Sequence, residues 1–288
     1  MSKSNPEYDF QWCPGCGDFG VRRAIEMAVA NRIVELGEPV ENNVVVAGIG
    51  CSGNMVHLLE GPHPFGIHGI HGRTLPLAFG IKGSRPELNV VVVAGDGDFL
   101  SIGAEHIGPQ AHRNLNVTCV IMDNGVYGLT KGQSSPTTEL GEVTPTTPFG
   151  KIETPVNPLE LFLTYGVSFV ASCYSSRVKE LSVLIMEAMA HPGFAIVHVQ
   201  SPCVTYNDTH EELKGNPAKG IIPRVYPVPA EHDTASRNAA FTLVRGQGVP
   251  IGVLYRDPES KPLDQRYAEA MAQAQPRSVA QQLSAFTV

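Results

Sequence analysis

Short apolar runs alternate along the chain with segments in which apolar residues recur at helical spacing. β-Branched runs ending near glycine or aspartate predict buried strands at Asn43–Ile49, Asn89–Ala94 and Asn116–Met122. Helical spacing predicts helices at Gly20–Leu36, Leu75–Lys82 and Phe99–Arg113. Buried strands that alternate with helices are typical of a doubly wound, mostly parallel α/β sheet.

The alternation continues after a long interruption. Residues Thr130–Pro158 are rich in Thr, Pro and Gly, which predicts a long loop, and loops of this length are usually functional. Strand–helix alternation then resumes at Pro158–Tyr165, Phe169–Ala171, Val178–Ala190 and Ala195–Gln200. From about Asp208 the pattern weakens and prolines accumulate. We therefore expect a main domain at residues 1–207 and a C-terminal arm at 208–288 that packs on the core or on a partner subunit.

Composition narrows the class of protein. The 288 residues are 42% hydrophobic and 17% charged, as in a globular chain with a sizeable core. A net charge of −7 without a basic stripe argues against nucleic acid as a partner. The amino-terminal segment lacks the apolar core of a signal peptide, and no apolar stretch has the ~18 residues of a membrane span. These features predict a cytoplasmic protein that does not contact membranes.

Two polar loops follow predicted strands. Gly95-Asp96-Gly97 comes directly after the second strand, and Asp123-Asn124-Gly125 comes directly after the third, with residues 98–122 between them. Both loops emerge at the carboxyl edge of a parallel sheet, where such folds bind ligands. The carboxylate of Asp96, the amide oxygen of Asn124 and a following carbonyl suit Mg²⁺, and the helix expected to begin near Phe99 would direct its amide end toward an anion. Each motif alone is more often an ordinary turn, so the prediction depends on the pair.

Six cysteines in a chain of this composition indicate metal binding or burial rather than a disulfide framework. Cys13 and Cys16 form a CxxC pair, Cys51 follows the first predicted strand, and Cys203 follows the strand that ends at Gln200. Four thiolates from separate loops suit either Zn²⁺ or an iron–sulfur cluster. The remaining two, Cys119 and Cys173, are expected to be buried and apolar in role.

Several longer strings resemble the beta subunit of 2-oxoacid:ferredoxin oxidoreductases. From Trp12 to Asp208 they are, in order, WCPGCG, GIGCSG, HGRTLPLAFGIK, GDGDFLSIG, DNGVYGLTKGQ and SPCVTYND. The resemblance implies a thiamine-diphosphate-binding fold in which Asp96, Asn124 and the Val126 carbonyl bind Mg²⁺. Asp123 stands where the family's fingerprint has the first Asn of an NN pair, a position that is generally not a metal ligand.

The same resemblance implies a set of cofactor contacts and a [4Fe–4S] cluster. The contacts to thiamine diphosphate would come from Gly95, Asp96, Gly97, Asp98, Asn124, Val126, Tyr127, Gly128, Leu129 and Thr130. The cluster ligands would be Cys13, Cys16, Cys51 and Cys203. Candidate catalytic residues are His71, Arg73 and Lys131, although a histidine and an arginine that only hold a loop, and a solvated lysine, are the ordinary alternatives. His68 is a weaker candidate.

The activity that the resemblance implies is coenzyme A-dependent oxidative decarboxylation of a 2-oxoacid, with electrons passing through the cluster to ferredoxin, in a reaction that can also run in reverse. An alpha subunit would supply the carboxylate that activates the cofactor's aminopyrimidine. We therefore expect a heterodimer or a dimer of heterodimers. The LTKGQ string resembles members that use 2-oxoglutarate more than those that use pyruvate, so 2-oxoglutarate is favoured and pyruvate is the alternative substrate.

Two other hypotheses remain open from the residues alone. One is a non-oxidative thiamine-diphosphate decarboxylase or carboligase in which the cysteines hold a structural zinc. The other is a metal-stabilised scaffold in which both polar loops are only turns. Iron content and Mg²⁺-dependent binding of thiamine diphosphate distinguish these from the oxidoreductase.

Overall fold

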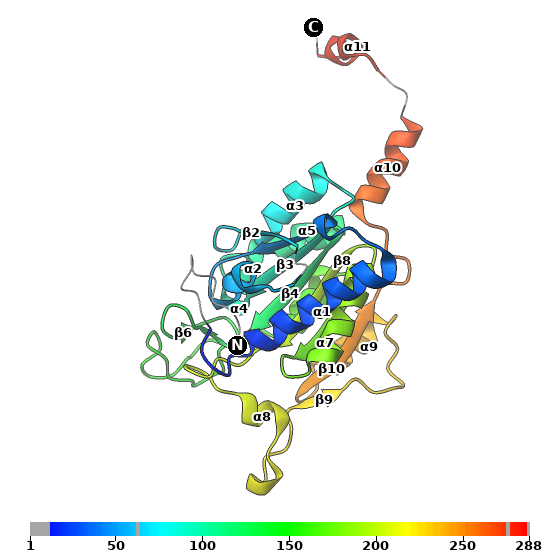
Figure 1. Ribbon diagram of the computed structural model, residues 1–288. Coiled ribbons are helices and arrows are strands. Elements are labelled where there is room, and N and C mark those ends of the chain that lie inside the picture. The colour runs from blue at the N-terminus through cyan, green and yellow to red at the C-terminus, as the bar shows by residue number, and fades with distance from the viewer. Residues whose placement is uncertain (1–11, 62–63, 275–276, 287–288) are drawn as a thin grey trace.

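The structure is a computed structural model that describes residues 12–61, 64–274 and 277–286. Its centre is an eight-stranded sheet of order β2-β1-β3-β4-β8-β7-β10-β9 (Figure 1). The strands are β1 Asn43–Ala47, β2 Phe65–His68, β3 Asn89–Gly95, β4 Val117–Asp123, β7 Phe169–Tyr174, β8 Phe194–Gln200, β9 Val225–Pro227 and β10 Val249–Arg256. Neighbouring strands are parallel except at the β7–β10 pair, so the expected doubly wound, mostly parallel α/β sheet is confirmed.

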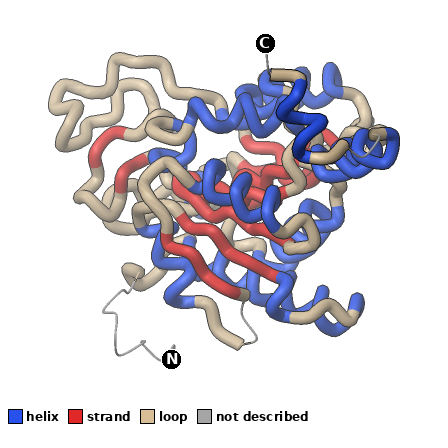
Figure 2. Tube along the Cα trace, turned by 90° about the horizontal axis from the view of Figure 1, so that it is seen from above, coloured by secondary structure: helices blue, strands red, loops and turns tan. Residues whose placement is uncertain are grey.

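Helices cover both faces of this sheet (Figure 2). The helices of the described residues are α1 Asp18–Leu36, α2 Met55–Leu58, α3 Thr74–Ser84, α4 Asp96–Leu100, α5 Ile107–Arg113, α6 Pro158–Tyr165, α7 Val178–Ala190, α8 His210–Lys214, α9 Arg237–Val244, α10 Leu263–Gln273 and α11 Val279–Ser284. One apolar core lies under α1 and α7, and a second lies under α3, α5, α6 and α9. Successive strand residues alternate between the two, as Val45 and Val46 do, because side chains of a strand point to opposite faces.

The sheet places the carboxyl ends of β1, β3, β4 and β8 at one edge. Gly95 of β3 is in register with Met122 of β4, and Asp123 of β4 is in register with Gln200 of β8. The loops after these four strands carry Cys51, the GDG motif, the DNG motif and Cys203. Their side chains therefore meet because the strands are parallel and adjacent.

The helix expected at Phe99–Arg113 is wrong in its bounds. The structure has α4 at Asp96–Leu100, a 3₁₀ turn at Ala104–His106 and then α5. The break lies where the backbone approaches Gly72 so closely that a Cβ there would lie 2.6 Å from the Ile102 side chain. Asp96 is therefore in the first turn of a short helix instead of preceding a long one.

The segment after residue 207 divides into two parts. The first part contains β9 and β10, and β10 pairs antiparallel with β7, so these residues extend the central sheet. The second part, α10 and α11, has no buried residue and extends away from the sheet (Figure 1). The sequence pattern did not predict the first part because β10 pairs with β7, which lies far from it in the sequence.

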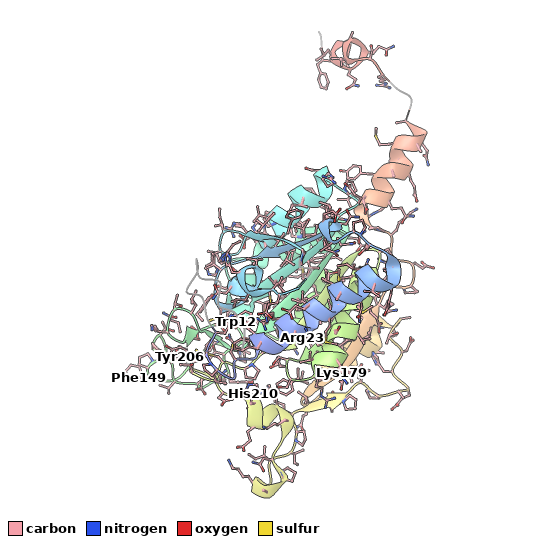
Figure 3. All side chains as sticks on the ribbon, in the orientation of Figure 1. Trp12, Arg23, Phe149, Lys179, Tyr206 and His210 are labelled. Carbon is pink, nitrogen blue, oxygen red and sulfur yellow. The ribbon has the colours of Figure 1, made fainter. Side chains whose placement is uncertain are left out.

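Between β4 and α6 the chain forms the expected long loop. Two-residue strands β5 Val126–Tyr127 and β6 Gln133–Ser134 pair at its beginning. The rest is held by hydrogen bonds within the loop and by contacts with residues outside it, and Phe149 at its outer part is 99% exposed (Figure 3).

Candidate active site

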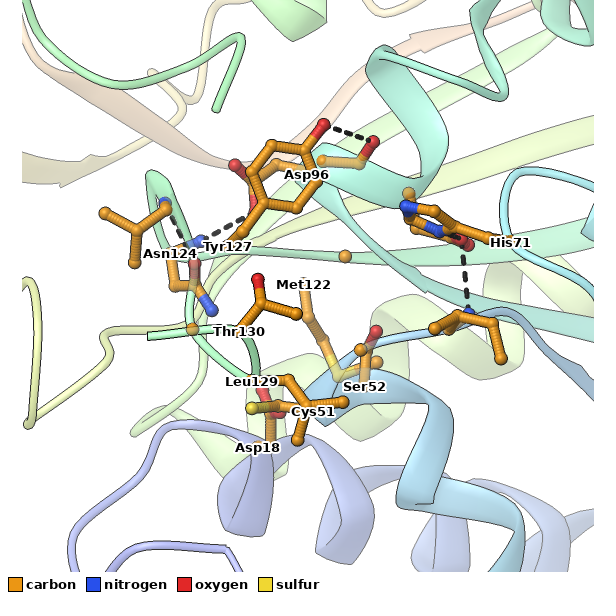
Figure 4. Close-up of a pocket in the computed structure, with 17 residues that line it drawn as sticks. Asp18, Cys51, Ser52, His71, Asp96, Met122, Asn124, Tyr127, Leu129 and Thr130 are labelled. Carbon is orange, nitrogen blue, oxygen red and sulfur yellow. Dashed lines mark hydrogen bonds and ion pairs between the residues drawn. The ribbon is translucent and has the colours of Figure 1, made fainter. Parts of the chain in front are cut away.

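A cavity of about 170 Å³ lies at the carboxyl edge of the sheet (Figure 4). Its wall contains the residues predicted to contact a cofactor. They are Gly95, Asp96, Gly97, Asp98, Asn124, Val126, Tyr127, Gly128, Leu129 and Thr130, and the wall also includes Asp18, Cys51, Ser52 and His71. The structure thus brings the GDG and DNG loops together around one space.

Asp96 and Asp123 form a pair of buried carboxylates beside this cavity. Asp96 is 1% exposed, and burial together with the neighbouring Asp123 raises its pKa to about 7. Burial also opposes ionisation of Asp123, but hydrogen bonds, first of all from the His198 imidazole at 2.9 Å, outweigh it and lower the Asp123 pKa. A buried carboxyl group with a second carboxylate beside it is stabilised in its charged form by a cation, so the pair fits a metal-binding role.

The DNG loop is shaped by its own polar groups. The Asn124 side-chain oxygen accepts a hydrogen bond from the Val126 amide at 3.0 Å, and the Asp123 carboxylate accepts one from the Gly125 amide at 3.1 Å. The backbone amide of Asn124 donates to Asp96 Oδ1 at 3.5 Å. Asp96 is therefore bonded to the DNG loop, and Asp96 and Asn124, whose side chains carry the oxygen atoms that Mg²⁺ prefers, both line the cavity.

The hydroxyl of Ser52 provides a further test of whether a ligand fits here. Ser52 lines the cavity, is 4% exposed, and its Oγ is buried without a hydrogen-bond partner among the described residues. A Cβ on Gly95 would lie 3.3 Å from this oxygen. A buried hydroxyl at a cavity wall suits a polar ligand group.

His71 reaches the cavity through a contact with Asp98. Its Nδ1 bonds the buried Asp98 carboxylate, which also accepts from the backbone amides of Gly72 at 2.7 Å and Ile49 at 3.2 Å. Asp98 therefore ties the loops after β1 and β2 to α4. The bond at Nδ1 leaves the Nε2 atom of His71 available to a ligand.

Arg73 and Lys131 lie outside the wall of this cavity. The Arg73 guanidinium donates to the Ile102 carbonyl at 2.7 Å and lies 3.3 Å from the Glu105 carboxylate. Lys131 is exposed and has a φ of 86°, a left-handed conformation in which a lysine is strained. These positions place Arg73 in a structural network and Lys131 on the exposed surface of the loop that follows Thr130.

The four predicted cluster cysteines come from three loops that contact one another. The amide of Cys16 donates to the Cys13 carbonyl at 3.0 Å, which closes a tight turn, and Gly17 donates to the Pro202 carbonyl at 3.1 Å. The Trp12 indole donates to the Cys51 carbonyl at 2.8 Å. The structure thus joins the CxxC turn to the loops of Cys51 and Cys203.

Burial disfavours the thiolate form of two of these cysteines, Cys16 and Cys51. Burial, with the Asp18 carboxylate as the second cause, raises the pKa of Cys51 to about 12 and the pKa of Cys16 well above its usual range. Cys203 also raises the pKa of Cys51, and both raise the pKa of Cys16. The sulfur atoms of Cys51 and Cys203 lie beside the same residue, Gly128. Buried thiolates that repel one another are stabilised by a cationic metal centre, which fits the chemistry of this donor set.

Gly128 lies at the cavity wall, close to two of these sulfur atoms. A Cβ on Gly128 would lie 3.5 Å from the Cys203 sulfur and 3.6 Å from the Cys51 sulfur, and Gly128 and Cys51 both line the cavity. The cysteine group and the cavity are therefore in direct contact.

The remaining two cysteines behave as expected. Cys119 in β4 and Cys173 in β7 are both 0% exposed, and burial raises the pKa of each thiol.

In the described part of the chain, no three His, Cys, Asp or Glu side chains are grouped as ligands of a single metal ion.

Three residues of this site were not predicted from the sequence. Thr137 bonds both Asp96 and Asp123, Asn207 donates from its side chain to the Asn124 carbonyl at 2.9 Å, and Ser52 lines the cavity. Thr137 lies in the long loop, and the length of that loop was the only feature of the sequence that indicated a functional role there.

Comparisons with known proteins agree on a family. Residues 48–199 match the family described as "Thiamine pyrophosphate enzyme, C-terminal TPP binding domain", and residues 203–272 match the C-terminal family of the pyruvate ferredoxin oxidoreductase beta subunit. A 2-oxoacid:ferredoxin oxidoreductase subunit beta from Sulfolobus sp is 42% identical over 264 residues, which cover 89% of this chain and 85% of that protein. The 2-oxoglutarate synthase subunit KorB of Archaeoglobus fulgidus is 39% identical over 203 residues, or 70% of this chain and 72% of that protein.

A solved structure is similar over nearly the whole chain. It is that of a 2-oxoglutarate:ferredoxin oxidoreductase from Magnetococcus marinus with 2-oxoglutarate, coenzyme A and succinyl-CoA bound. The TM-score is 0.84 at 37% identity, covering 98% of this chain and 94% of the other. Over the residues that the structure describes, every helix is too short or too polar to cross a membrane.

Proposed function

The chain belongs to the 2-oxoacid:ferredoxin oxidoreductase family as a beta subunit, and from this premise we propose that it binds Mg²⁺–thiamine diphosphate and a [4Fe–4S] cluster side by side. In complex with an alpha subunit it would convert a 2-oxoacid and coenzyme A into acyl-coenzyme A and CO₂. The electrons released would leave singly through the cluster to ferredoxin.

The single observation that carries this proposal is the position of Gly128. Gly128 lines the cavity, and the sulfur atoms of Cys51 and Cys203 both lie within 3.6 Å of where its Cβ would be. Electron transfer from a cofactor in the cavity to iron on these cysteines then requires no long path. A non-oxidative decarboxylase has no use for such a contact.

Each part of the cavity has a proposed role. Asp96, Asn124 and the Val126 carbonyl would hold Mg²⁺, while Gly95 and Gly97 admit the diphosphate close to the backbone. Bound thiamine diphosphate would supply the electron-accepting ring that decarboxylation of a 2-oxoacid needs. The residues of this chain bind and orient that cofactor, and the cysteines keep an electron acceptor beside it.

Two side chains are proposed to act on the substrate. His71, whose Nδ1 is bound by Asp98, would present Nε2 to a ligand in the cavity. Lys131 would pair with a substrate carboxylate or a coenzyme A phosphate. Arg73 would act on the substrate only if it left its contacts with Ile102 and Glu105.

We favour 2-oxoglutarate as substrate, with pyruvate as the alternative. The KorB relative is named a 2-oxoglutarate synthase subunit, and the similar solved structure is described with 2-oxoglutarate and succinyl-CoA bound. These substrates are those of the two similar proteins, and the similarity supports the preference for 2-oxoglutarate in this chain.

The test is to purify the chain with its alpha subunit and assay a panel of 2-oxoacids for coenzyme A-dependent reduction of a one-electron dye. Reduction with 2-oxoglutarate, together with iron in the complex and broad absorbance near ~400 nm, is the expected result. Zinc in place of iron, with decarboxylation that does not reduce the dye, would support the carboligase alternative instead.

A further inference from the structure

The long loop reaches back to the two buried carboxylates through Thr137. Its hydroxyl lies 2.8 Å from Asp96 Oδ2 and 2.7 Å from Asp123 Oδ1. Thr137 is 41 residues from Asp96 in sequence and 14 from Asp123. Among the described residues, no other hydroxyl forms hydrogen bonds to both carboxylates.

A threonine hydroxyl has one hydrogen to donate and faces two carboxylate oxygens here. With both groups ionised, one of the two contacts is a repulsion between lone pairs. A divalent cation on the other oxygen of Asp96 would draw charge away from that carboxylate and relieve the repulsion. Asp123 is also bonded by His198 and the Gly125 amide, whereas Asp96 depends on the Asn124 backbone amide and on hydroxyls of the long loop.

We propose that Thr137 is a positioning residue for the metal: it holds the Asp96 carboxylate by Oδ2, fixes the orientation in which Asp96 would bind a cation, and links that ligand to Asp123. This role rests on the proposed Mg²⁺–thiamine diphosphate site. The Thr137 hydroxyl would belong to the outer ligand sphere of the metal, where hydrogen bonds orient the direct ligands.

The loop holds Thr137 firmly. Its neighbour Thr138 donates to the Gly125 carbonyl at 2.5 Å, so the segment is bonded to the DNG loop itself. The Lys151 ammonium, in a residue that is 5% exposed, donates to the Ser135 carbonyl at 2.8 Å and the Pro136 carbonyl at 3.1 Å. Burying an ammonium is costly unless its hydrogen bonds are made, so this anchor fixes the path of the segment.

Thr137→Val tests the role because it removes the hydroxyl at nearly constant volume, and Thr137→Ser restores a donor. The alpha–beta complex of each variant is titrated with Mg²⁺ at fixed thiamine diphosphate, and cofactor binding is followed by calorimetry. Loss of an outer-sphere contact weakens metal binding by about 10- to 100-fold, so we expect a shift of this size for valine and near-normal values for serine. Thr242→Val, an exposed threonine on α9 that bonds its own helix, is the matched control.

Thermal melting without Mg²⁺ separates positioning from general stability. If Thr137→Val lowers the melting temperature but leaves the Mg²⁺ dependence like that of Thr242→Val, the inference is wrong. Should the valine variant not fold, Thr137→Ala gives the same readout with less bulk. Absence of any Mg²⁺-dependent cofactor binding in the unaltered complex would overturn the proposed function as well, so the two failures are distinguishable.

Discussion

Gly97 lies directly against the ring of Tyr127. A Cβ on Gly97 would be 2.3 Å from the Tyr127 Cε1 atom, and the Tyr127 hydroxyl donates to the Gly97 carbonyl at 3.3 Å. The aromatic ring after the DNG loop thus packs onto the turn of the GDG motif. This contact joins the two halves of the candidate site and depends on the missing side chain at Gly97.

Gly97→Ala should therefore separate the two loops. The added methyl group cannot fit without displacing Tyr127, since real Cβ atoms do not approach within 3.0 Å of other heavy atoms. We expect affinity for thiamine diphosphate to fall at least ~10-fold, measured by calorimetry at saturating Mg²⁺.

Gly80→Ala is the control for this substitution. Gly80 lies in α3, is exposed, and a Cβ there meets nothing within 4 Å. Helix propensity predicts unchanged cofactor binding and a stabilisation of up to about 1 kcal/mol. Equal binding by the Gly97 and Gly80 variants would show that the close contact does not shape the site.

Replacement of Cys51 or Cys203 by Ser should remove the iron from the complex. Both sulfur atoms lie beside Gly128, and the proposed four-thiolate set would lose a ligand in each variant. We expect absorbance near ~400 nm and iron per complex to fall to a small fraction of the unaltered value. Cys119→Ala, at a fully buried position in β4, should keep its iron.

Lys131→Ala should raise the Michaelis constant for the 2-oxoacid or for coenzyme A. Loss of an exposed ion pair with a substrate anion is worth up to about 1 kcal/mol, or roughly 5-fold. Lys179→Ala, an exposed lysine on α7 (Figure 3), should leave both constants unchanged. Unaltered constants for both substrates in the Lys131 variant would exclude this lysine from substrate binding.

His191 should make the fold less stable in acid. Burial, and secondarily Arg256, lowers the His191 pKa from 6.5 to about 4. As the pH falls from 6.5 toward 4, the unfolded chain takes up a proton that the folded chain does not, so unfolding becomes more favourable by up to about 3 kcal/mol. Well above pH 6.5 the His191 imidazole is neutral in both the folded and the unfolded chain, so it causes no such loss of stability.

The check is to compare thermal midpoints of the unaltered complex and a His191→Gln variant between pH 7 and pH 4.5. Gln retains a donor for the Ser168 hydroxyl, which lies 2.9 Å from the imidazole, but it does not titrate. The unaltered complex should lose more stability across this range. Parallel pH profiles would mean that His191 does not carry the acid sensitivity.

The local pattern of hydrophobic residues was sufficient to predict most strands of the sheet. The runs of valine in β1 and β3 predicted their strands because each residue is buried on one face or the other. The expected helix at Phe99–Arg113 was wrong because a close approach of Gly72 to Ile102 interrupts it. The participation of β10 in the sheet was missed because its pairing with β7 joins segments far apart in sequence.

By itself the sequence determined that two polar loops and three cysteine loops follow strands of a parallel sheet or adjoin them, and parallel strands bring such loops to one edge. The tertiary structure was needed to show that Gly128 of the cavity wall lies beside two sulfur atoms and that Thr137 contacts both carboxylates. The physical reason is the range of the interactions. Strand and helix patterns are local, whereas the path of a long loop depends on packing and hydrogen bonds to distant residues, such as those of Lys151 to the Ser135 and Pro136 carbonyls.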